Sequence, residues 1–312
     1  MLVVGAVSMA AGLLLTATVQ NIYLGYLTYG MGVGLAVACG YVPMVSAVGG
    51  WFERQRATAL GVAVAGIGLG TLAGAPLAAR LIDATTWRKT YVIFAIVGAA
   101  LMLLAATVAE RGPAAVAVDR PRPLGELLRR ADFARLYAAI IFASLGLFVP
   151  FVFIASYAEE RGTSEVAAGI LLGLIGGASI VGRLGLGALA DRLGTTRLFQ
   201  MSFAVMAASH LIWLVAGDRL ALLIVYTVVL GVGYGGFIAL TPAVTALRFG
   251  IEGLGGVLGT LYTAAGIGSL FGPPLAGVLR DEFGYDLAII FAAAVSGVAV
   301  LILLPLREPT RP

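Results

Sequence analysis

The feature that most constrains this chain is the absence of charge from its first 52 residues. The stretch from Met1 to Phe52 contains no Asp, Glu, Lys or Arg. One membrane-spanning helix needs about 20 apolar residues, so the stretch is too long for a single span and fits two. Gln20 and Asn21 supply the polar turn between them. The sequence therefore predicts a helical hairpin that crosses a lipid bilayer.

The rest of the chain has the same character, with 12% charged and 60% hydrophobic residues. Soluble proteins usually carry about a quarter charged residues. We therefore predict an all-α membrane protein, a bundle of ten spans separated by charged or turn-rich breaks. The predicted spans are 1–18, 22–50, 57–80, 90–109, 134–158, 165–189, 197–217, 220–247, 253–279 and 287–306.

Two parts of the sequence repeat each other. AGIG at 65–68 recurs at 265–268, and GAPLAARLID at 74–83 resembles GPPLAGVLRD at 272–281. Such a repeat is typical of membrane bundles built from two related halves. The third and fourth predicted spans therefore correspond to the ninth and tenth.

The repeat also predicts how the chain is divided. Four predicted spans precede the matching helix in the second half and only two do so in the first. We therefore expect ten spans of a twelve-span, six-plus-six design, with the first two helices missing ahead of Met1. The predicted domains are an incomplete N-terminal bundle at 1–109, a cytoplasmic linker at 110–133 and a C-terminal bundle at 134–312.

Basic residues predict the orientation, because loops on the cytoplasmic side of a membrane are enriched in Lys and Arg. If Arg54 and Arg56 lie on the cytoplasmic side, thirteen basic residues lie on that side and six on the opposite side. We therefore expect a protein of the cell (inner) membrane with both termini in the cytoplasm. These residues are scattered over short loops, which does not favour a nucleic-acid partner. The lipid bilayer is the partner that the composition implies.

One permanent charge lies within membrane depth: Arg183, in the sixth predicted span. An arginine at the centre of a span costs about 2.5–3.5 kcal/mol to insert, so we expect it to face a cavity or a partner. No carboxylate lies at comparable depth in another span, and a guanidinium suits a carboxylate in two-pronged contact. Two interpretations stay open: Arg183 binds an anion, or it extends to the membrane interface near Asp191.

Other residues within the spans have weaker implications. His210 is interpreted as a hydrogen-bonded packing residue. Tyrosine hydroxyls can bind a carboxylate, although packing is the commoner role of an aromatic residue in a span. The tyrosines in spans that would line a central cavity are Tyr41, Tyr234 and Tyr262.

Glycines at four-residue spacing predict helix faces that pack closely and can slide past each other. They are Gly66, Gly70 and Gly74 in one span and Gly169, Gly173 and Gly177 in another.

Four motifs resemble the major facilitator superfamily, and within it the branch related to monocarboxylate transporters. WFERQRATALGVAVAGIGLG, at 51–70, is similar to that branch's signature at the entry to its fifth helix. GALADRLGTTR, at 187–197, is similar to a cytoplasmic loop signature of the superfamily. FVPFVFIASYAEERG at 148–162 and GPPLAG at 272–277 also resemble the branch.

The resemblance implies a role for each matching residue. Arg183 matches the arginine that binds the substrate carboxylate in the family, and the aspartate of the loop signature, Asp191, faces a helix N-terminus there. Proton-coupled members often have an aspartate one turn before that arginine, where this sequence has Ser179. The residues expected to gate the cytoplasmic side are Gly187, Asp191, Arg192, Gly194, Arg197, Arg54 and Arg56.

The leading hypothesis is a secondary active transporter of a small organic anion, a monocarboxylate, working by alternating access as a symporter or antiporter. A coupling proton is left open. The alternatives are a truncated or mis-started protein that does not transport, and a carrier of another small solute. A carrier of neutral or cationic drugs would call for an intramembrane carboxylate, which this sequence lacks. No metal-ligand cluster, catalytic pair or phosphate loop is present, so we expect no enzyme activity, metal or cofactor.

Overall fold

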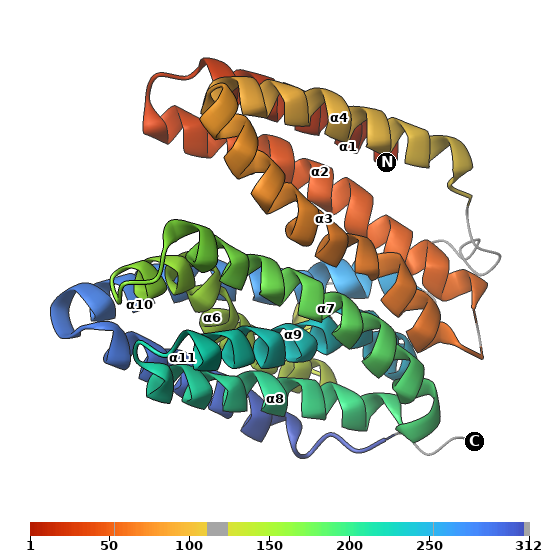
Figure 1. The fold of residues 1–312 in the computed structure, drawn as a ribbon. Coiled ribbons are helices and arrows are strands. Elements are labelled where there is room, and N and C mark those ends of the chain that lie inside the picture. The colour runs from red at the N-terminus through yellow and green to blue at the C-terminus, as the bar shows by residue number, and fades with distance from the viewer. Residues whose placement is uncertain (53, 111–123, 252, 309–312) are drawn as a thin grey trace.

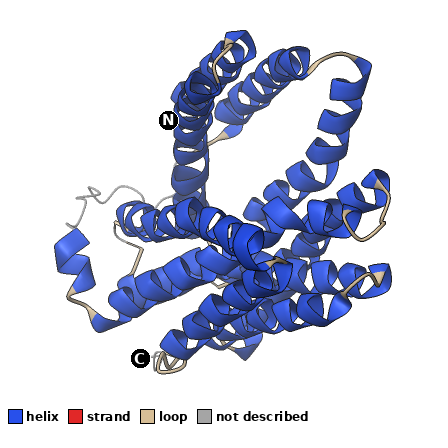
Figure 2. Cartoon of the chain, turned by 90° about the vertical axis from the view of Figure 1, so that its left-hand side faces the viewer, coloured by secondary structure: helices blue, strands red, loops and turns tan. Residues whose placement is uncertain are grey.

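The computed structural model describes residues 1–52, 54–110, 124–251 and 253–308. Helices are the only regular secondary structure in these ranges (Figure 2). The helices are α1 (Leu2–Thr18), α2 (Ile22–Trp51), α3 (Arg56–Ala84), α4 (Trp87–Val108), α5 (Leu124–Leu128), α6 (Ala131–Glu159), α7 (Glu165–Leu193), α8 (Thr195–Ala216), α9 (Leu220–Phe249), α10 (Leu254–Phe283) and α11 (Tyr285–Leu303).

Each predicted span coincides with one of these helices, and only the short α5 was not expected. Among the described residues, nine helices are long and apolar enough to cross a membrane, and α1, with 17 residues, is shorter. Several helices extend about one turn beyond the predicted apolar run, because their ends continue into polar sequence. Asn21 shows how the first turn is made, since its side chain accepts a hydrogen bond from the Tyr23 amide at 2.9 Å and caps α2.

The helices form two groups (Figure 1). We call α1–α4 the N-terminal half and α6–α11 the C-terminal half. α1 packs with both α2 and α4, and α1 and α4 lie away from the C-terminal half, whereas α3 packs mainly against α7 and also contacts α9. α3 is therefore the main connection between the halves, and α2 adds smaller contacts with α9 and α10.

The largest buried side chains lie mainly in the C-terminal half. Trp213, Tyr157, Tyr226 and Phe133 are each less than 2% exposed. His210 belongs to this core: it is fully buried, and its Nδ1 lies 3.3 Å from the hydroxyl of Tyr226. The interpretation of His210 as a hydrogen-bonded packing residue is thus confirmed.

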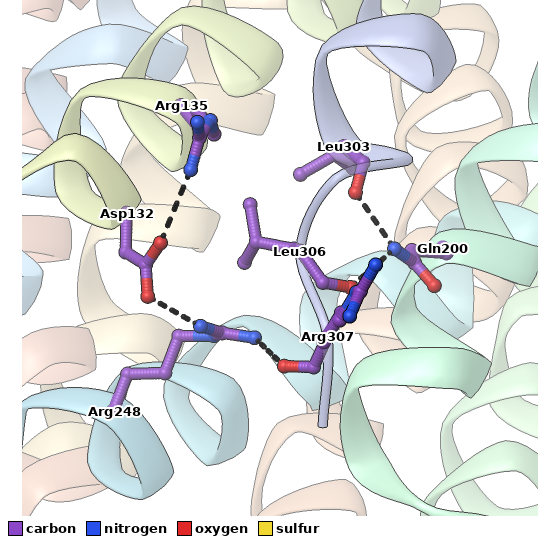
Figure 3. A network of polar contacts seen from close by, with 7 residues as sticks. All are labelled: Asp132, Arg135, Gln200, Arg248, Leu303, Leu306 and Arg307. Carbon is purple, nitrogen blue, oxygen red and sulfur yellow. Dashed lines mark hydrogen bonds and ion pairs between the residues drawn. The ribbon is translucent and has the colours of Figure 1, made fainter. Parts of the chain in front are cut away.

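One end of the molecule carries the chain segments 54–56, 194–196 and 304–308, and we call this end the tail face. There Arg248 forms an ion pair with Asp132 at 2.6 Å and donates a hydrogen bond to the carbonyl of Arg307 (Figure 3). The Gln200 side chain donates to the carbonyls of Leu303 and Leu306 at 2.7 and 2.9 Å. These contacts fasten the end of α11 and the segment after it to α8 and α9, and the ion pair links α9 to α6.

The predicted linker at 110–133 lies mostly outside the described residues. Its described part contains α5 and the first residues of α6.

The predicted glycine faces were wrong. A Cβ added at Gly66, Gly70 or Gly74 would meet no described atom within 4 Å, and the same holds for Gly169 and Gly173. Of the six, only Gly177 has a neighbour, the side chain of Leu72 at 3.4 Å.

Other glycines make the close contact between α3 and α7. Gly61 lies against the Arg183 carbonyl, Gly187 against the Ala57 carbonyl, and Gly176 against Thr71. Four-residue spacing identifies a helix face made of small residues, but the neighbouring helix decides which face is buried. Here the buried face of each helix is a different one from the predicted face.

Candidate functional site

Arg183 lies at the junction between the two halves. The residue is 0% exposed, so its side chain does not extend to the membrane interface. Position 68 of α3, in the other half, faces it directly: a Cβ at Gly68 would stand 2.5 Å from Arg183 Nη1. From α9, the ring of Tyr234 lies with its centroid 5.3 Å from Arg183 Cζ.

The guanidinium of Arg183 makes a close hydrogen bond to Ser179, and the side chain of Tyr234 lies near enough to interact with it as well. Its Nη1 donates to the hydroxyl of Ser179, one turn earlier on α7, at 2.8 Å. Nε and Nη2 are buried and have no partner in the described part of the chain, and no described carboxylate pairs with this cation. Buried charges are normally paired, so two free N–H groups on a buried cation suit a ligand.

The three predicted tyrosines lie close to this group. The hydroxyls of Tyr41 on α2 and Tyr262 on α10 are 3.1 Å apart, and their rings make an edge contact with centroids at 5.3 Å. Tyr41 is near enough to Tyr234 and Arg183 to interact with both electrostatically. The structure thus brings together all four predicted binding residues, from α2, α7, α9 and α10.

A second feature joins the halves at the tail face. Asp191, near the end of α7, accepts hydrogen bonds from the Ala57 and Thr58 amides at 3.3 and 3.1 Å and from the Thr58 hydroxyl at 2.7 Å. These amides belong to the first turn of α3, where helix N–H groups are unpaired and the helix dipole favours a negative charge. A carboxylate of one half therefore caps a helix of the other.

Four other residues of the predicted gate lie near this cap. Gly187 allows α7 to approach Ala57, and Arg54 and Arg192 line the same groove as Asp191. Arg56 Nε donates to the carbonyls of Gly49 and Phe52, both at 3.0 Å, which ties the start of α3 to the end of α2.

The other two predicted gate residues lie at the turn from α7 to α8. Gly194 makes this turn at φ +105°, a conformation that favours glycine. Arg197 is exposed on the first turn of α8.

The sequence analysis did not assign several residues that contact Arg183 or cap helices at the tail face. Ser179 and Gly68 touch the guanidinium, and Thr58 receives Asp191. Glu308 accepts the Thr195 and Thr196 amides at 3.0 and 2.9 Å and caps α8, as Asp191 caps α3. Ser179 stands four residues before Arg183, the spacing that places two side chains on one helix face, and this signal was available.

The whole chain matches one family model, the Major Facilitator Superfamily, over residues 1–221 and 136–312. The chain belongs to this superfamily. The expected family and fold are confirmed, and the chain is a multi-pass membrane protein of a transporter superfamily.

Curated relatives within the superfamily cover nearly all of this chain. Monocarboxylate transporter 13 of Bos taurus is 29% identical over 96% of this chain and 72% of its own length. Monocarboxylate transporter 12 of Homo sapiens is 28% identical, over 96% and 67%. The aspyridones efflux protein apdF of Emericella nidulans is 27% identical, over 93% and 60%.

A solved structure shares the fold. The crystal structure of the human organic anion transporter MFSD10 (TETRAN) aligns with a TM-score of 0.71 and 17% identity, over 97% of this chain and 76% of that one. At this identity the likeness concerns the fold alone.

Proposed function

We propose that this chain binds a small monocarboxylate at Arg183 and moves it across a membrane by alternating access, as a secondary active transporter. The observation that carries the proposal is the buried guanidinium between the halves, with Nε and Nη2 unpartnered among the described residues. A carboxylate would satisfy both N–H groups in one bidentate contact. The nearby hydroxyls of Tyr41, Tyr234 and Tyr262 would offer further hydrogen bonds to the bound anion.

Two relatives support the same substrate class, since both are named monocarboxylate transporters. An organic anion suits the charge of the site, because the described helices offer a cation at this depth and no carboxylate beside it.

We further propose that the Asp191 cap on α3 is a latch. Alternating access requires the halves to separate at each face in turn, and this cap joins them at the tail face. Separation would leave a carboxylate and two helix amides to be solvated, so the cap favours the arrangement closed at the tail face. Four of the gate residues lie beside the latch, namely Gly187, Arg192, Arg54 and Arg56, and the other two, Gly194 and Arg197, lie at the turn from α7 to α8.

In this proposal the tail face is cytoplasmic in a cell membrane, with both termini on that side, because most basic residues outside the spans lie there. Cysteines introduced at Arg197 and at Arg219 in a Cys39→Ala background test this. A membrane-impermeant thiol reagent applied to whole cells should label position 219 and spare position 197. The reverse labelling would contradict the orientation.

The binding role is tested by replacing Arg183 with Met in the purified chain and measuring binding of radiolabelled propionate. Hydrogen bonds to charged groups contribute about 1.5–3 kcal/mol, so affinity should fall roughly 10- to 100-fold. Arg183→Lys should recover part of it, because a point charge remains without the bidentate fork. Arg88→Gln, which removes an exposed arginine of α4, is the control and should bind like the parent.

A second readout separates a site residue from a structural one. Removing a buried charge that has no counter-ion among the described residues should leave the thermal unfolding temperature of Arg183→Met equal to that of the parent or higher. Unchanged propionate affinity in this variant would remove Arg183 from the site. Binding without uptake into proteoliposomes would support the alternative of a non-transporting membrane protein.

A further inference from the structure

The three nitrogens of the Arg183 guanidinium are not equivalent. Nη1 is engaged by Ser179, whereas Nε and Nη2 are unpartnered among the described residues. A guanidinium can hold a carboxylate end-on, through Nη1 and Nη2, or side-on, through Nε and Nη2, with two parallel N–H bonds in either case. The bond from Nη1 to Ser179 leaves the side-on edge without a close hydrogen bond among the described residues, with the side chain of Tyr234 nearby.

Ser179 is itself held in place. Its hydroxyl donates to the carbonyl of Gly176 at 2.6 Å, which uses its only hydrogen and leaves its lone pairs for Arg183. Both Ser179 and Arg183 are 0% exposed, so water does not compete for this bond. The serine therefore acts as a fixed acceptor that selects one orientation of the guanidinium.

The other half contributes the second constraint. A side chain at position 68 would meet Nη1 of Arg183 and Cγ1 of Ile180, each at 2.5 Å, so only glycine leaves the guanidinium its present place. The Tyr234 ring, 5.3 Å from Cζ, makes a further contact with the group. Nη1 is thus enclosed by Ser179 from α7 and by the backbone of α3.

We infer that Ser179 and Gly68 are positioning residues that present the Nε–Nη2 edge of Arg183 to the ligand, and that this makes the site selective for a planar carboxylate over a sulfonate. This inference rests on the proposed function. The two oxygens of a carboxylate lie in one plane and match two parallel N–H groups of a fixed fork. A sulfonate places a third oxygen out of that plane, close to Tyr234 and the helices that enclose the group.

The test compares propionate with ethanesulfonate, which share an ethyl group and a single charge. Binding is measured by competition with radiolabelled propionate on the purified chain. The parent protein should bind propionate about tenfold or more tightly than ethanesulfonate. Ser179→Ala should weaken propionate binding about tenfold and bring the ratio of the two affinities close to one, because the freed guanidinium can adopt other orientations.

Gly68→Ala should have the same effect from the other half, because its Cβ displaces Nη1. The matched controls are Gly66→Ala, on the same helix with open space around it, and Ser144→Ala, a buried serine whose hydroxyl has no described partner. Both controls should keep the parent affinity and ratio. Size-exclusion profiles check folding, and Ser179→Ala keeps the test valid if Gly68→Ala does not fold.

The outcomes separate the two proposals. Parent-like affinities and ratios in Ser179→Ala, or equal affinities of the parent protein for the two anions, would overturn this inference while leaving Arg183 as the anion site. A parent protein that binds neither anion would overturn both the inference and the proposed function.

Discussion

Helices α3 and α10 contain the same four residues, Ala-Gly-Ile-Gly, and bury them against different neighbours. In α10, position 268 faces the Cβ of Ser144 and the carbonyl of Ile141, both on α6 of the same half. In α3, the equivalent Gly68 faces the Arg183 guanidinium, on α7 of the other half. The first glycine of each copy, Gly66 or Gly266, has open space around it.

The difference shows that one local pattern can serve two purposes. The second glycine of each copy, Gly68 or Gly268, lets a neighbour approach the helix closely. In α10 the neighbour is largely backbone, and the contact closes the interior of one half. In α3 the neighbour is the end of a long charged side chain, and the contact places a cation between the halves.

The largest expected effect is a difference in stability between the two equivalent glycines. Gly268→Ala drives a Cβ against backbone atoms of α6 that cannot move aside, and overpacking of this kind costs about 1–3 kcal/mol. Gly68→Ala meets the flexible end of Arg183, together with Cγ1 of Ile180 at 2.5 Å and the Gly176 carbonyl at 3.1 Å, so its loss should be smaller, about 1 kcal/mol. Thermal unfolding in detergent measures both, and equal losses would mean that the two copies pack alike.

An intermediate effect is expected from the two carboxylate caps. Asp191→Ala and Glu308→Ala each remove the cap from a helix N-terminus, at a cost of about 1 kcal/mol in unfolding free energy. Of these two caps, only the Asp191 cap joins the two halves. Asp191→Ala should therefore also lengthen the distance between spin labels at Val62 on α3 and Leu189 on α7, both of which are exposed.

Glu308→Ala, whose cap lies within the C-terminal half, is the control for that distance and should leave it unchanged. An unchanged distance in Asp191→Ala would contradict the latch.

The smallest effect concerns the first glycine of each copy. Gly66→Ala and Gly266→Ala should each raise stability by about 0.5–1 kcal/mol, because alanine is the better helix former and no described atom obstructs its Cβ. A loss of stability at position 66 alone, measured in the same unfolding assay, would show that this face of α3 is packed after all.

The sequence predicted the helices well because length and hydropathy decide where a chain can cross a bilayer. The absence of charge in the first 52 residues led directly to α1 and α2, and Asn21 marked their turn. Arg183 could be singled out because its charge is costly at that depth. Asp191 was found through its motif, and its place at a helix N-terminus is what the structure shows.

Helix pairing could not be predicted, and the errors follow from that. Gly66, Gly70 and Gly74 form as regular a face as any on α3, yet Gly61 and Gly68 are the ones that meet α7. Helix periodicity shows which residues share a face, but the packing of distant helices decides which face is buried. Gly68 became visible as a neighbour of Arg183 only in three dimensions, whereas the four-residue spacing of Ser179 from Arg183 was already a signal in the sequence.

The segment that follows α11 is held through its main chain. Gln200 and Arg248 bind the carbonyls of residues 303, 306 and 307, and every amino acid, proline included, has a carbonyl. The side chain at the exposed position 307 can therefore be substituted without loss of these hydrogen bonds (Figure 3). Glu308 is different, because its side chain makes the contact, so among related proteins residue 308 should change less than residue 307.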